Sequence, residues 1–309
     1  MKVSIIGGGG RVGSDAAYAL QLGGVVNHIA LVDVNEELAA GEALDLRHGA
    51  ALIANQTFTS GSYEACVDSD CVVITAGLRR KPDESRLDLI NRNVGLFKGI
   101  LDELKKVKLA SGATILVVSN PVDILTHMTA VDGTWDPSHV LGLGTVLDTS
   151  RFRSLMADHF NVGAADVKAV ILVEHGDSMV PIWSSATIGG VPLASLPGWS
   201  SSLAAELFDS TKKSGATVIA QKGGAGRAVG VSIKEVVEAM ALDNGKLLPV
   251  SSKQTGTLGI SDISLSLPTF VGRHGVDSVL APAVSDAEKA LLIKSSEALK
   301  ATWAQVLAG

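Results

Sequence analysis

The chain has 309 residues, which is enough for two hydrophobic cores and close to the upper limit for one. Its net charge of −6 and its aromatic content of 4% exclude a nucleic-acid interface built on cations and base stacking. It has no apolar run of about 18 residues, so we expect no membrane span and no membrane partner.

The first half of the chain alternates strand and helix patterns. Short apolar segments predict strands at 3–6, 28–32, 71–75, 114–118 and 139–141, and helical patterns include 11–22, 35–47 and 87–110. Asn35 is expected to cap the second of these helices, because two glutamates follow it in the first turn. Repeated βα units with continuous apolar strands predict a parallel sheet that is covered on both faces.

The second half has a mixed pattern. We expect helices at 147–160, 203–221, 229–241 and 286–307, strands at 167–173 and 182–188, and hairpin-like strands between 247 and 280. The fold class is therefore α/β. A doubly wound parallel sheet of the Rossmann type is expected over 1–143, and an α+β substrate-binding or catalytic domain over 144–309.

A glycine run joins the first strand to the first helix. Gly7, Gly8, Gly10 and Gly13 fit patterns that let helix N–H groups approach a pyrophosphate. Asp33 ends the second strand 20 residues later, where a carboxylate binds an adenosine ribose and repels a 2′-phosphate. The pair favours NAD over NADP. The alternative is a tight turn with an unrelated, solvated aspartate.

A cationic loop follows the strand at 71–75. It contains Arg79, Arg80, Lys81 and Arg86 on a molecule whose net charge is negative. A loop this positive at the end of a strand predicts a local site for an anion.

His175 ends a strand pattern in the second half, and the chain has seven histidines, so alone it is a weak candidate. Asp148 and Arg151 lie three residues apart on one face of a predicted helix. An aspartate beside a histidine favours the protonated imidazole, and an arginine offers a planar fork to a carboxylate. From spacing alone, a surface ion pair between Asp148 and Arg151 is the preferred interpretation.

Five segments in fixed order carry a resemblance to a known family. They are Ile5-Ile6-Gly7 to Gly13, Thr75-Ala76-Gly77 to Leu89, Val118-Ser119-Asn120-Pro121-Val122-Asp123, Gly142 to Arg151, and Glu174 to Ser178. By these segments the whole chain resembles the lactate/malate dehydrogenase superfamily.

The resemblance implies a role for each candidate. His175 would act as the general acid and base, with Asp148 holding its ring. Arg151 would bind the substrate's C1 carboxylate, and Arg86 would polarise the reacting carbonyl as the loop closes. Asn120 would donate a hydrogen bond near the substrate oxygen and the nicotinamide.

The resemblance also implies NAD as the cofactor. The glycine run, Asp33, Asn93 and Asn120 would hold it, and no metal is expected. A homo-oligomer, either dimer or tetramer, would follow from the family, and the resemblance favours a homotetramer. The helix at 36–47 has apolar side chains for a subunit contact.

Arg80 indicates the substrate. By the resemblance, malate dehydrogenases place arginine at this loop position and lactate dehydrogenases place glutamine. An unpaired buried guanidinium costs about 2–5 kcal/mol, which would disfavour pyruvate against oxaloacetate. The expectation is therefore a malate dehydrogenase of the tricarboxylic acid cycle with a dicarboxylate substrate. Ala225 supports it weakly, and Asp83 departs from the family's usual glycine.

Two alternatives stay open. One is a lactate or other 2-hydroxy-acid dehydrogenase, and the other is a dinucleotide-binding sensor without catalysis. The compartment is expected to be a reducing cytoplasm, because Cys66 and Cys71 have no disulfide or metal pattern and the first residues lack the features of a signal peptide.

Overall fold

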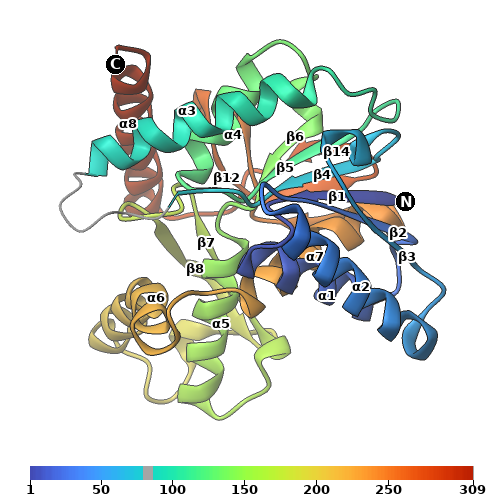
Figure 1. Cartoon of the computed structure of the whole chain (residues 1–309). Coiled ribbons are helices and arrows are strands. Elements are labelled where there is room, and N and C mark those ends of the chain that lie inside the picture. Colours follow the sequence, from blue (N-terminus) through green and yellow to red (C-terminus); the bar gives the residue numbers. More distant parts are fainter. Residues whose placement is uncertain (79–85, 309) are drawn as a thin grey trace.

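The computed structural model describes residues 1–78 and 86–308, with Arg86 described by its backbone alone. Within this part of the chain the main sheet has eight strands in the order β12-β11-β6-β5-β4-β1-β2-β3 (Figure 1). Its strands are β1 (Lys2–Ile6), β2 (His28–Val32), β3 (Thr57–Ser60), β4 (Cys71–Ile74), β5 (Thr114–Val117), β6 (Val140–Gly142), β11 (Ser251–Thr255) and β12 (Ser261–Ser266).

Two three-stranded sheets accompany the main sheet. One contains β10 (Lys246–Leu248), β13 (Thr269–Gly272) and β14 (Gly275–Val279), and the other contains β7 (Val167–Leu172), β8 (Val180–Ile188) and β9 (Val191–Pro192). The α-helices are α1 (Arg11–Gly23), α2 (Glu36–Ile53), α3 (Arg86–Leu104), α4 (Val122–Val131), α5 (Val146–Phe160), α6 (Ser201–Lys222), α7 (Arg227–Leu242) and α8 (Asp286–Ala308). Short 3-10 turns lie at Tyr63–Cys66, Pro137–His139, Ala164–Asp166, Leu193–Ser195 and Thr257–Gly259.

Strands β1 to β6 are parallel and follow the spatial order 3-2-1-4-5-6. This order is that of the doubly wound dinucleotide-binding fold, so the predicted fold class is confirmed. The chain reverses direction across the sheet between β1 and β4. Such a switch point opens a crevice at the carboxyl ends of the strands.

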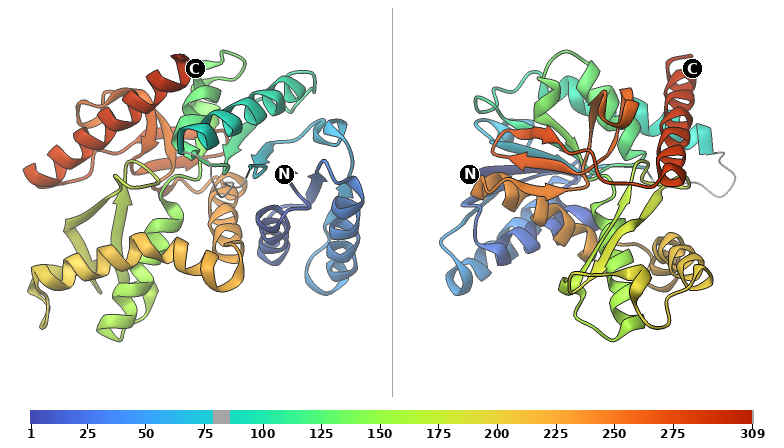
Figure 2. Two further views of the ribbon diagram at one scale, coloured as in Figure 1. Left: turned by 60° about the vertical axis from the view of Figure 1, so that its left-hand side comes forward. Right: turned by 180° about the vertical axis from the view of Figure 1, so that it is seen from behind.

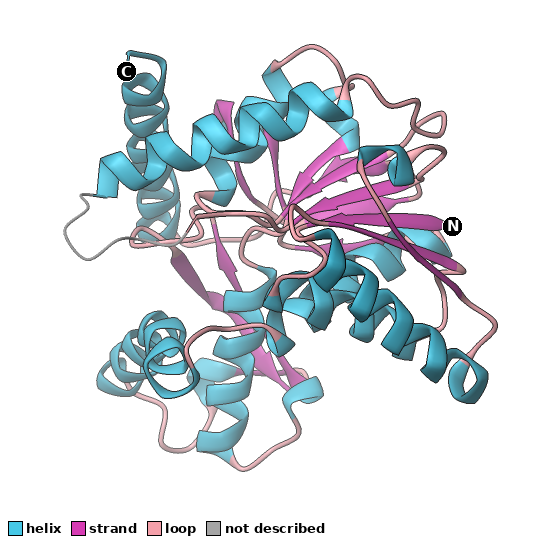
Figure 3. Ribbon diagram, viewed as in Figure 1, coloured by secondary structure: helices cyan, strands magenta, loops and turns pink. Residues whose placement is uncertain are grey.

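Helices cover both faces of the main sheet (Figure 3). Buried side chains of α1, α2 and α7 pack with Val3 and Ile5 on one face, and those of α3 and α4 pack with Ile6 and Ile74 on the other. Successive residues of a strand point to opposite faces, which is why these strands are apolar throughout.

The helices α5 and α6 and the strands β7 to β9 form a lobe beside the main sheet (Figure 2). Its core includes Phe152 of α5, Ile171 of β7 and Leu207 of α6. Because α5 starts and β7 ends next to the carboxyl edge of the main sheet, the lobe brings its side chains to the crevice.

Glu288 fastens α8 to this lobe. It is the third residue of α8, and with Ser285 it forms a capping box, since Ser285 N–H donates to Glu288 Oε2 over 2.8 Å and Glu288 N–H donates to Ser285 Oγ over 3.3 Å. The same carboxylate accepts the N–H groups of Trp183 and Ser184 at 2.7 and 3.0 Å and the Ser184 hydroxyl at 2.6 Å. The buried Glu288 side chain therefore caps the N-terminus of α8 and also holds β8 in place.

The main sheet crosses the expected boundary at residue 143. Strand β11 pairs with β6 through Ser251 and Gly142, and α7 lies so close to α1 that a Cβ on Gly230 would come within 2.6 Å of the Asp15 carbonyl oxygen. The division into 1–143 and 144–309 therefore stays a prediction about folding units. The hairpin-like strands expected after residue 247 are present, and two of them extend the first sheet.

Most expected elements are present, with shifted ends. Asn35 caps α2 as predicted, since Leu38 N–H donates to its Oδ1 over 3.1 Å. Helix α2 continues to Ile53, whereas α3 ends at Leu104. Strand β3 was not expected. In the described part of the chain, no helix combines the length and the apolar character needed to span a bilayer.

Candidate active site

Side chains join the turns at the carboxyl edge of the parallel strands. Thr75, after β4, donates its hydroxyl to Ile6 O of β1 over 2.9 Å. Ser119, after β5, donates its hydroxyl to Ile74 O of β4 over 3.1 Å. These bonds hold three neighbouring turns in register, so the groups that follow β1, β4 and β5 keep fixed positions around the crevice.

The glycine loop leaves no room for side chains where it packs. A Cβ on Gly13 would lie 2.2 Å from Gly7 O, and one on Gly8 would lie 2.8 Å from Leu31 Cβ. Gly7 has φ +86°, which favours glycine. Gly10 differs, because it is exposed and its Cβ would meet one atom, Gly7 O, at 3.2 Å. The loop therefore packs closely against the strand and helix at Gly8 and Gly13, whereas at Gly10 it leaves exposed space in which a phosphate could bind.

The N-terminus of α1 fits an anion. Gly10 is its N-cap and makes no side-chain cap, and the first turn carries no acidic residue. Asp33 lies beside this loop and accepts the Gly9 N–H at 3.0 Å and the Asn35 N–H at 3.0 Å. These bonds fix the carboxylate at the end of β2. The residues present therefore fit a dinucleotide, with the pyrophosphate at Gly10 and the adenosine ribose at Asp33.

His175, Asp148 and Arg151 form one cluster around the buried Asp148 carboxylate. His175 Nδ1 lies 2.5 Å from Asp148 Oδ2, and Arg151 Nη1 lies 3.1 Å from Asp148 Oδ1. The Asp148 side chain is 1% exposed, whereas His175 is 24% and Arg151 is 18% exposed. The carboxylate is therefore covered, and the imidazole and guanidinium still reach the crevice. Spacing alone allowed a surface ion pair, and burial excludes it.

The start of α5 is bonded to β7, and this holds Asp148 in place. Thr145 donates its hydroxyl to Ile171 O over 2.6 Å, and Ile171 N–H donates to Thr149 Oγ1 over 3.0 Å. Thr145 and Thr149 lie one helical turn apart and flank Asp148. Since β7 leads to His175, the two partners of the acid–base pair are built on one rigid unit.

The cluster favours the charged forms of both partners. Burial opposes protonation of His175, but the Asp148 carboxylate outweighs burial and raises the pKa of His175. Burial would likewise raise the pKa of Asp148, but the charge of His175 and then that of Arg151 outweigh it and lower that pKa. The cluster therefore favours an imidazolium beside a carboxylate, which is the state that can donate a proton.

Two further residues shape the His175 turn, and the sequence reasoning did not single them out. Val173 has φ +67°, a left-handed conformation that is rare for a β-branched residue, and a two-way backbone bridge to Ser266 holds it at 2.8 and 3.1 Å. Asp123 accepts the His175 N–H at 2.8 Å. Asp123 ends the Asn-Pro-Val-Asp segment, which was the available signal for it.

The two candidate asparagines lie near the crevice with different surroundings. Asn120 is exposed at the end of β5, and its Oδ1 accepts the Val122 N–H at 3.3 Å. Asn93 of α3 is buried, and its amide bonds both the N–H and the carbonyl of Leu78 at 2.7 and 3.3 Å. It holds the start of the cationic loop, and its contact with the cofactor stays a prediction.

Most of the cationic loop lies outside the residues that the structure describes. Arg79, Arg80, Lys81 and Asp83 lie outside the described residues. Arg86 is the first residue of α3, and its side chain is likewise outside them. The roles assigned to Arg80 and Arg86 therefore stay predictions.

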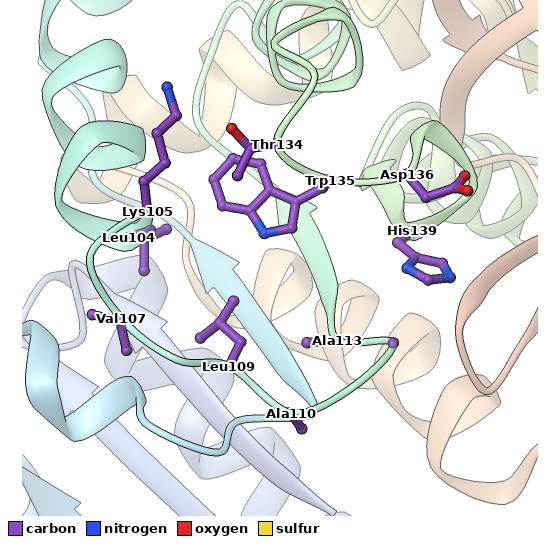
Figure 4. Close-up of a pocket in the computed structure, with 11 residues that line it drawn as sticks. Leu104, Lys105, Val107, Leu109, Ala110, Ala113, Thr134, Trp135, Asp136 and His139 are labelled. Carbon is purple, nitrogen blue, oxygen red and sulfur yellow. The ribbon is translucent and has the colours of Figure 1, made fainter.

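A separate hollow of about 240 Å³ lies at the opposite edge of the main sheet (Figure 4). Trp135, Leu109 and His139 line it, next to the amino ends of β5 and β6. The site residues lie at the carboxyl ends of these strands, so this hollow is not part of the crevice.

Family models match both halves of the chain. Residues 1–142 match the NAD-binding domain of lactate/malate dehydrogenase, and residues 145–308 match its α/β C-terminal domain. The chain belongs to the lactate/malate dehydrogenase family. NAD is accordingly its cofactor, in agreement with the fit of the glycine loop and Asp33.

Individual relatives in this family are similar along their whole length. An L-lactate dehydrogenase 1 of Clostridium acetobutylicum is 42% identical over 97% of this chain and 96% of the relative. An L-lactate dehydrogenase of Acetivibrio thermocellus is 40% identical over 97% and 95%. The crystal structure of the minor L-lactate dehydrogenase of Enterococcus mundtii superposes with a TM-score of 0.94 at 36% identity, over 99% of this chain and 98% of that one.

These names correct the expected substrate. The relatives are L-lactate dehydrogenases, which contradicts the expectation of a malate dehydrogenase, and with it the oxaloacetate substrate and the place in the tricarboxylic acid cycle. The error has a physical reason. The inference depended mainly on Arg80, next to Arg79 on a loop, with only weak support from Ala225. An arginine on a loop can stay in water without contacting a substrate.

Proposed function

We propose that the chain is an NAD-dependent L-lactate dehydrogenase, which interconverts L-lactate and pyruvate. The observation that carries the proposal is the 2.5 Å contact between His175 Nδ1 and Asp148 Oδ2, beside Arg151, in a chain whose relatives are L-lactate dehydrogenases. An imidazolium and a guanidinium side by side are the two groups that a 2-oxo acid requires: a proton for the ketone and a fork for the carboxylate.

Each described residue then has one task. Arg151 pairs with the carboxylate of pyruvate and orients the ketone toward the imidazole. His175 gives the proton on Nε2 to the ketone oxygen, and Asp148 stabilises the ring before and after transfer. In the reverse direction, neutral His175 takes the hydroxyl proton of lactate.

The cofactor supplies the hydride when it is bound. Gly10 and the N-terminus of α1 would hold its pyrophosphate, and Asp33 would hold its ribose. Asn120, at the end of β5, would lie between the nicotinamide and the substrate oxygen. Arg86, at the start of α3, would stabilise the developing negative charge on that oxygen.

The test is the loss of NADH absorbance with pyruvate, 2-oxobutyrate and oxaloacetate as separate substrates. Pyruvate is expected to have the highest kcat/KM. Higher kcat/KM for either other acid would contradict the lactate assignment while keeping the chemistry of His175. No turnover of any of the three would contradict the enzymatic function itself and favour a sensor.

A homo-oligomer is part of the proposal. Tyr18, Leu22 and Val231 are more than half exposed on α1 and α7, and a groove of about 650 Å³ lies between these helices. Of the apolar side chains expected to form a subunit contact on α2, Ala39, Ala43 and Leu46 are buried in the core and contribute no outer surface, whereas Leu38 and Leu44 are exposed. Light scattering would give the mass, and a monomer would contradict this part. A cytoplasmic location remains our expectation.

A further inference from the structure

Arg11 connects the cofactor loop to a distant part of the chain, and neither proton transfer nor hydride transfer assigns it a task. It is the first residue of α1 and directly follows Gly10, where the pyrophosphate would lie. Its Nη1 donates to Lys222 O over 2.8 Å and to Gly224 O over 3.0 Å. These two carbonyls belong to the end of α6 and to the turn that leads from α6 into α7.

The charge of Arg11 is unfavourable for α1 and favourable for α6. A cation in the first turn of a helix opposes the helix dipole, whereas a cation at the last turn complements it and can bind carbonyls that have no partner within the helix. Lys222 is the last residue of α6, and its carbonyl accepts from Arg11. The contacts of Arg11 therefore stabilise α6 and not the helix on which Arg11 lies.

The turn after α6 has little side-chain structure of its own. Residues 223–226 are Gly-Gly-Ala-Gly, and the first two have φ of +75° and +152°. Because glycine loses more conformational freedom on folding than any other residue, the sequence of this turn defines its conformation poorly. The turn lies against α1 so closely that a Cβ on Gly226 would collide with the Asp15 carboxylate. Contacts with α1 therefore determine where α6 ends.

Helix α6 also passes beside the residue to which the proposed function assigns the substrate carboxylate. A Cβ on Gly215 would lie 3.6 Å from both Nη1 and Nη2 of Arg151, so the α6 backbone borders the guanidinium. Gly215 lies about two turns, or about 10 Å, before the end of α6. Figure 2 shows α6 running from the lobe toward α1, where α7 begins. One helix thus has one part beside the substrate site and its end against the cofactor loop.

We propose that Arg11 is a positioning residue for the substrate site, which holds the end of α6 against the cofactor loop and thereby fixes α6 beside Arg151. The inference deepens the proposed function and rests on it, since it concerns the group that binds the carboxylate of a 2-oxo acid. Asp148 holds the guanidinium through a bond of 3.1 Å, and α6 limits its movement from the other lobe helix.

The proposal predicts which kinetic constant changes when Arg11 is lost. A displaced α6 leaves the Arg151 guanidinium less well oriented toward the carboxylate. The carboxylate is bound both before and during hydride transfer, so a weaker fork destabilises the ground state and the transition state equally. Such a loss appears in KM and leaves kcat unchanged.

The test compares Arg11→Met with Arg11→Lys and with Lys2→Met. The methionine keeps most of the apolar stem and removes the donor, whereas the lysine restores a donor. One nitrogen is enough, because both bonds of Arg11 leave from Nη1. Lys2→Met is the matched control, since Lys2 also donates to a backbone carbonyl, that of Val67 at 2.6 Å, but lies at the amino end of β1. Arg11 is exposed, so its variants should fold.

With pyruvate as substrate, Arg11→Met should raise KM about 10-fold and leave kcat and the dissociation constant of NADH within about twofold of the wild type. Arg11→Lys should restore most of the affinity for pyruvate, and Lys2→Met should match the wild type. A loss of NADH affinity as large as the rise in KM would overturn the proposal, because Arg11 would then act on the pyrophosphate. An unchanged KM in Arg11→Met, or an equal rise in Arg11→Lys or Lys2→Met, would also contradict it.

Hydrogen–deuterium exchange gives a second readout that needs no substrate. In Arg11→Met, amide protons in the last two turns of α6 should exchange at least about fivefold faster than in the wild type or Lys2→Met. The first turn of α6, which Ser200 caps, should be unaffected. Equal exchange at the end of α6 would overturn the proposal. If no 2-oxo acid is turned over, the proposed function fails, and the exchange comparison still decides whether Arg11 holds α6.

Discussion

Replacing Val173 tests whether the backbone of the His175 turn is strained. At an ordinary buried position glycine is less stable than alanine by about 1.3–1.8 kcal/mol, because it loses a methyl group and more chain entropy. Val173 has φ +67°, which costs an L-residue about 1–2 kcal/mol and costs glycine nothing. The two effects cancel. Val173→Gly and Val173→Ala should therefore have free energies of unfolding within about 0.5 kcal/mol of each other.

Urea unfolding at one fixed protein concentration measures the difference. Val180 is the matched control, because it is a buried valine on the neighbouring strand β8, where it pairs with Leu172. At this position the free energy of unfolding of Val180→Ala should exceed that of Val180→Gly by the ordinary difference of about 1.3–1.8 kcal/mol. The same gap at Val173 would refute the reasoning, since it would mean that the left-handed conformation carries no strain.

Three further predictions concern the acid–base pair and the anchor of α8. His175→Asn should lower kcat for pyruvate about 10²–10⁴-fold and leave NADH affinity intact, and a large loss of NADH binding in fluorescence titration would mean a structural role. Asp148→Asn should lower the His175 pKa. Reduction of pyruvate needs the protonated ring, so activity is present below the His175 pKa and is lost as the pH rises through it. In the variant this loss should occur at lower pH, and pH profiles of kcat/KM test this. Burial raises the pKa of Glu288, but hydrogen bonds from Ser184 and Ser285 outweigh it and lower that pKa, so its contribution is present above the unfolded pKa and lost as pH falls through the folded one. Glu288→Gln should accordingly cost about 1–3 kcal/mol at pH 7 and less near pH 3, and a constant difference across that range in urea unfolding would contradict this.

Patterns in short segments predicted much of this molecule. Continuous apolar strands, the cap at Asn35 and the glycine turn depend on local chemistry, and the structure has each of them. The cluster of His175, Asp148 and Arg151 could be inferred because the resemblance joined two distant segments. Spacing alone could not identify the cluster, since an aspartate and an arginine one turn apart on a helix also form ordinary surface ion pairs.

What could not be predicted depends on distant partners. Asp123 and Ser251 are 128 residues apart, and neither forms a pattern that points to the other. Val173 continues an apolar strand in sequence, so nothing local announces its left-handed backbone. The prediction of the substrate was wrong because it depended mainly on one loop side chain, Arg80. The charge of an arginine does not determine which group it contacts.

The return of the chain to its first sheet has a consequence for synthesis. A ribosome that has released residues up to 142 has made β6 with one edge unpaired and α1 without α7 against it. Open strand edges and uncovered apolar faces are where nascent chains associate wrongly. The nucleotide-binding sheet is completed only when β12 emerges, so a gene fragment encoding the first half alone should give an aggregating product. In this protein the sheet that carries the cofactor site is completed only after the catalytic residues Asp148, Arg151 and His175 have been synthesised.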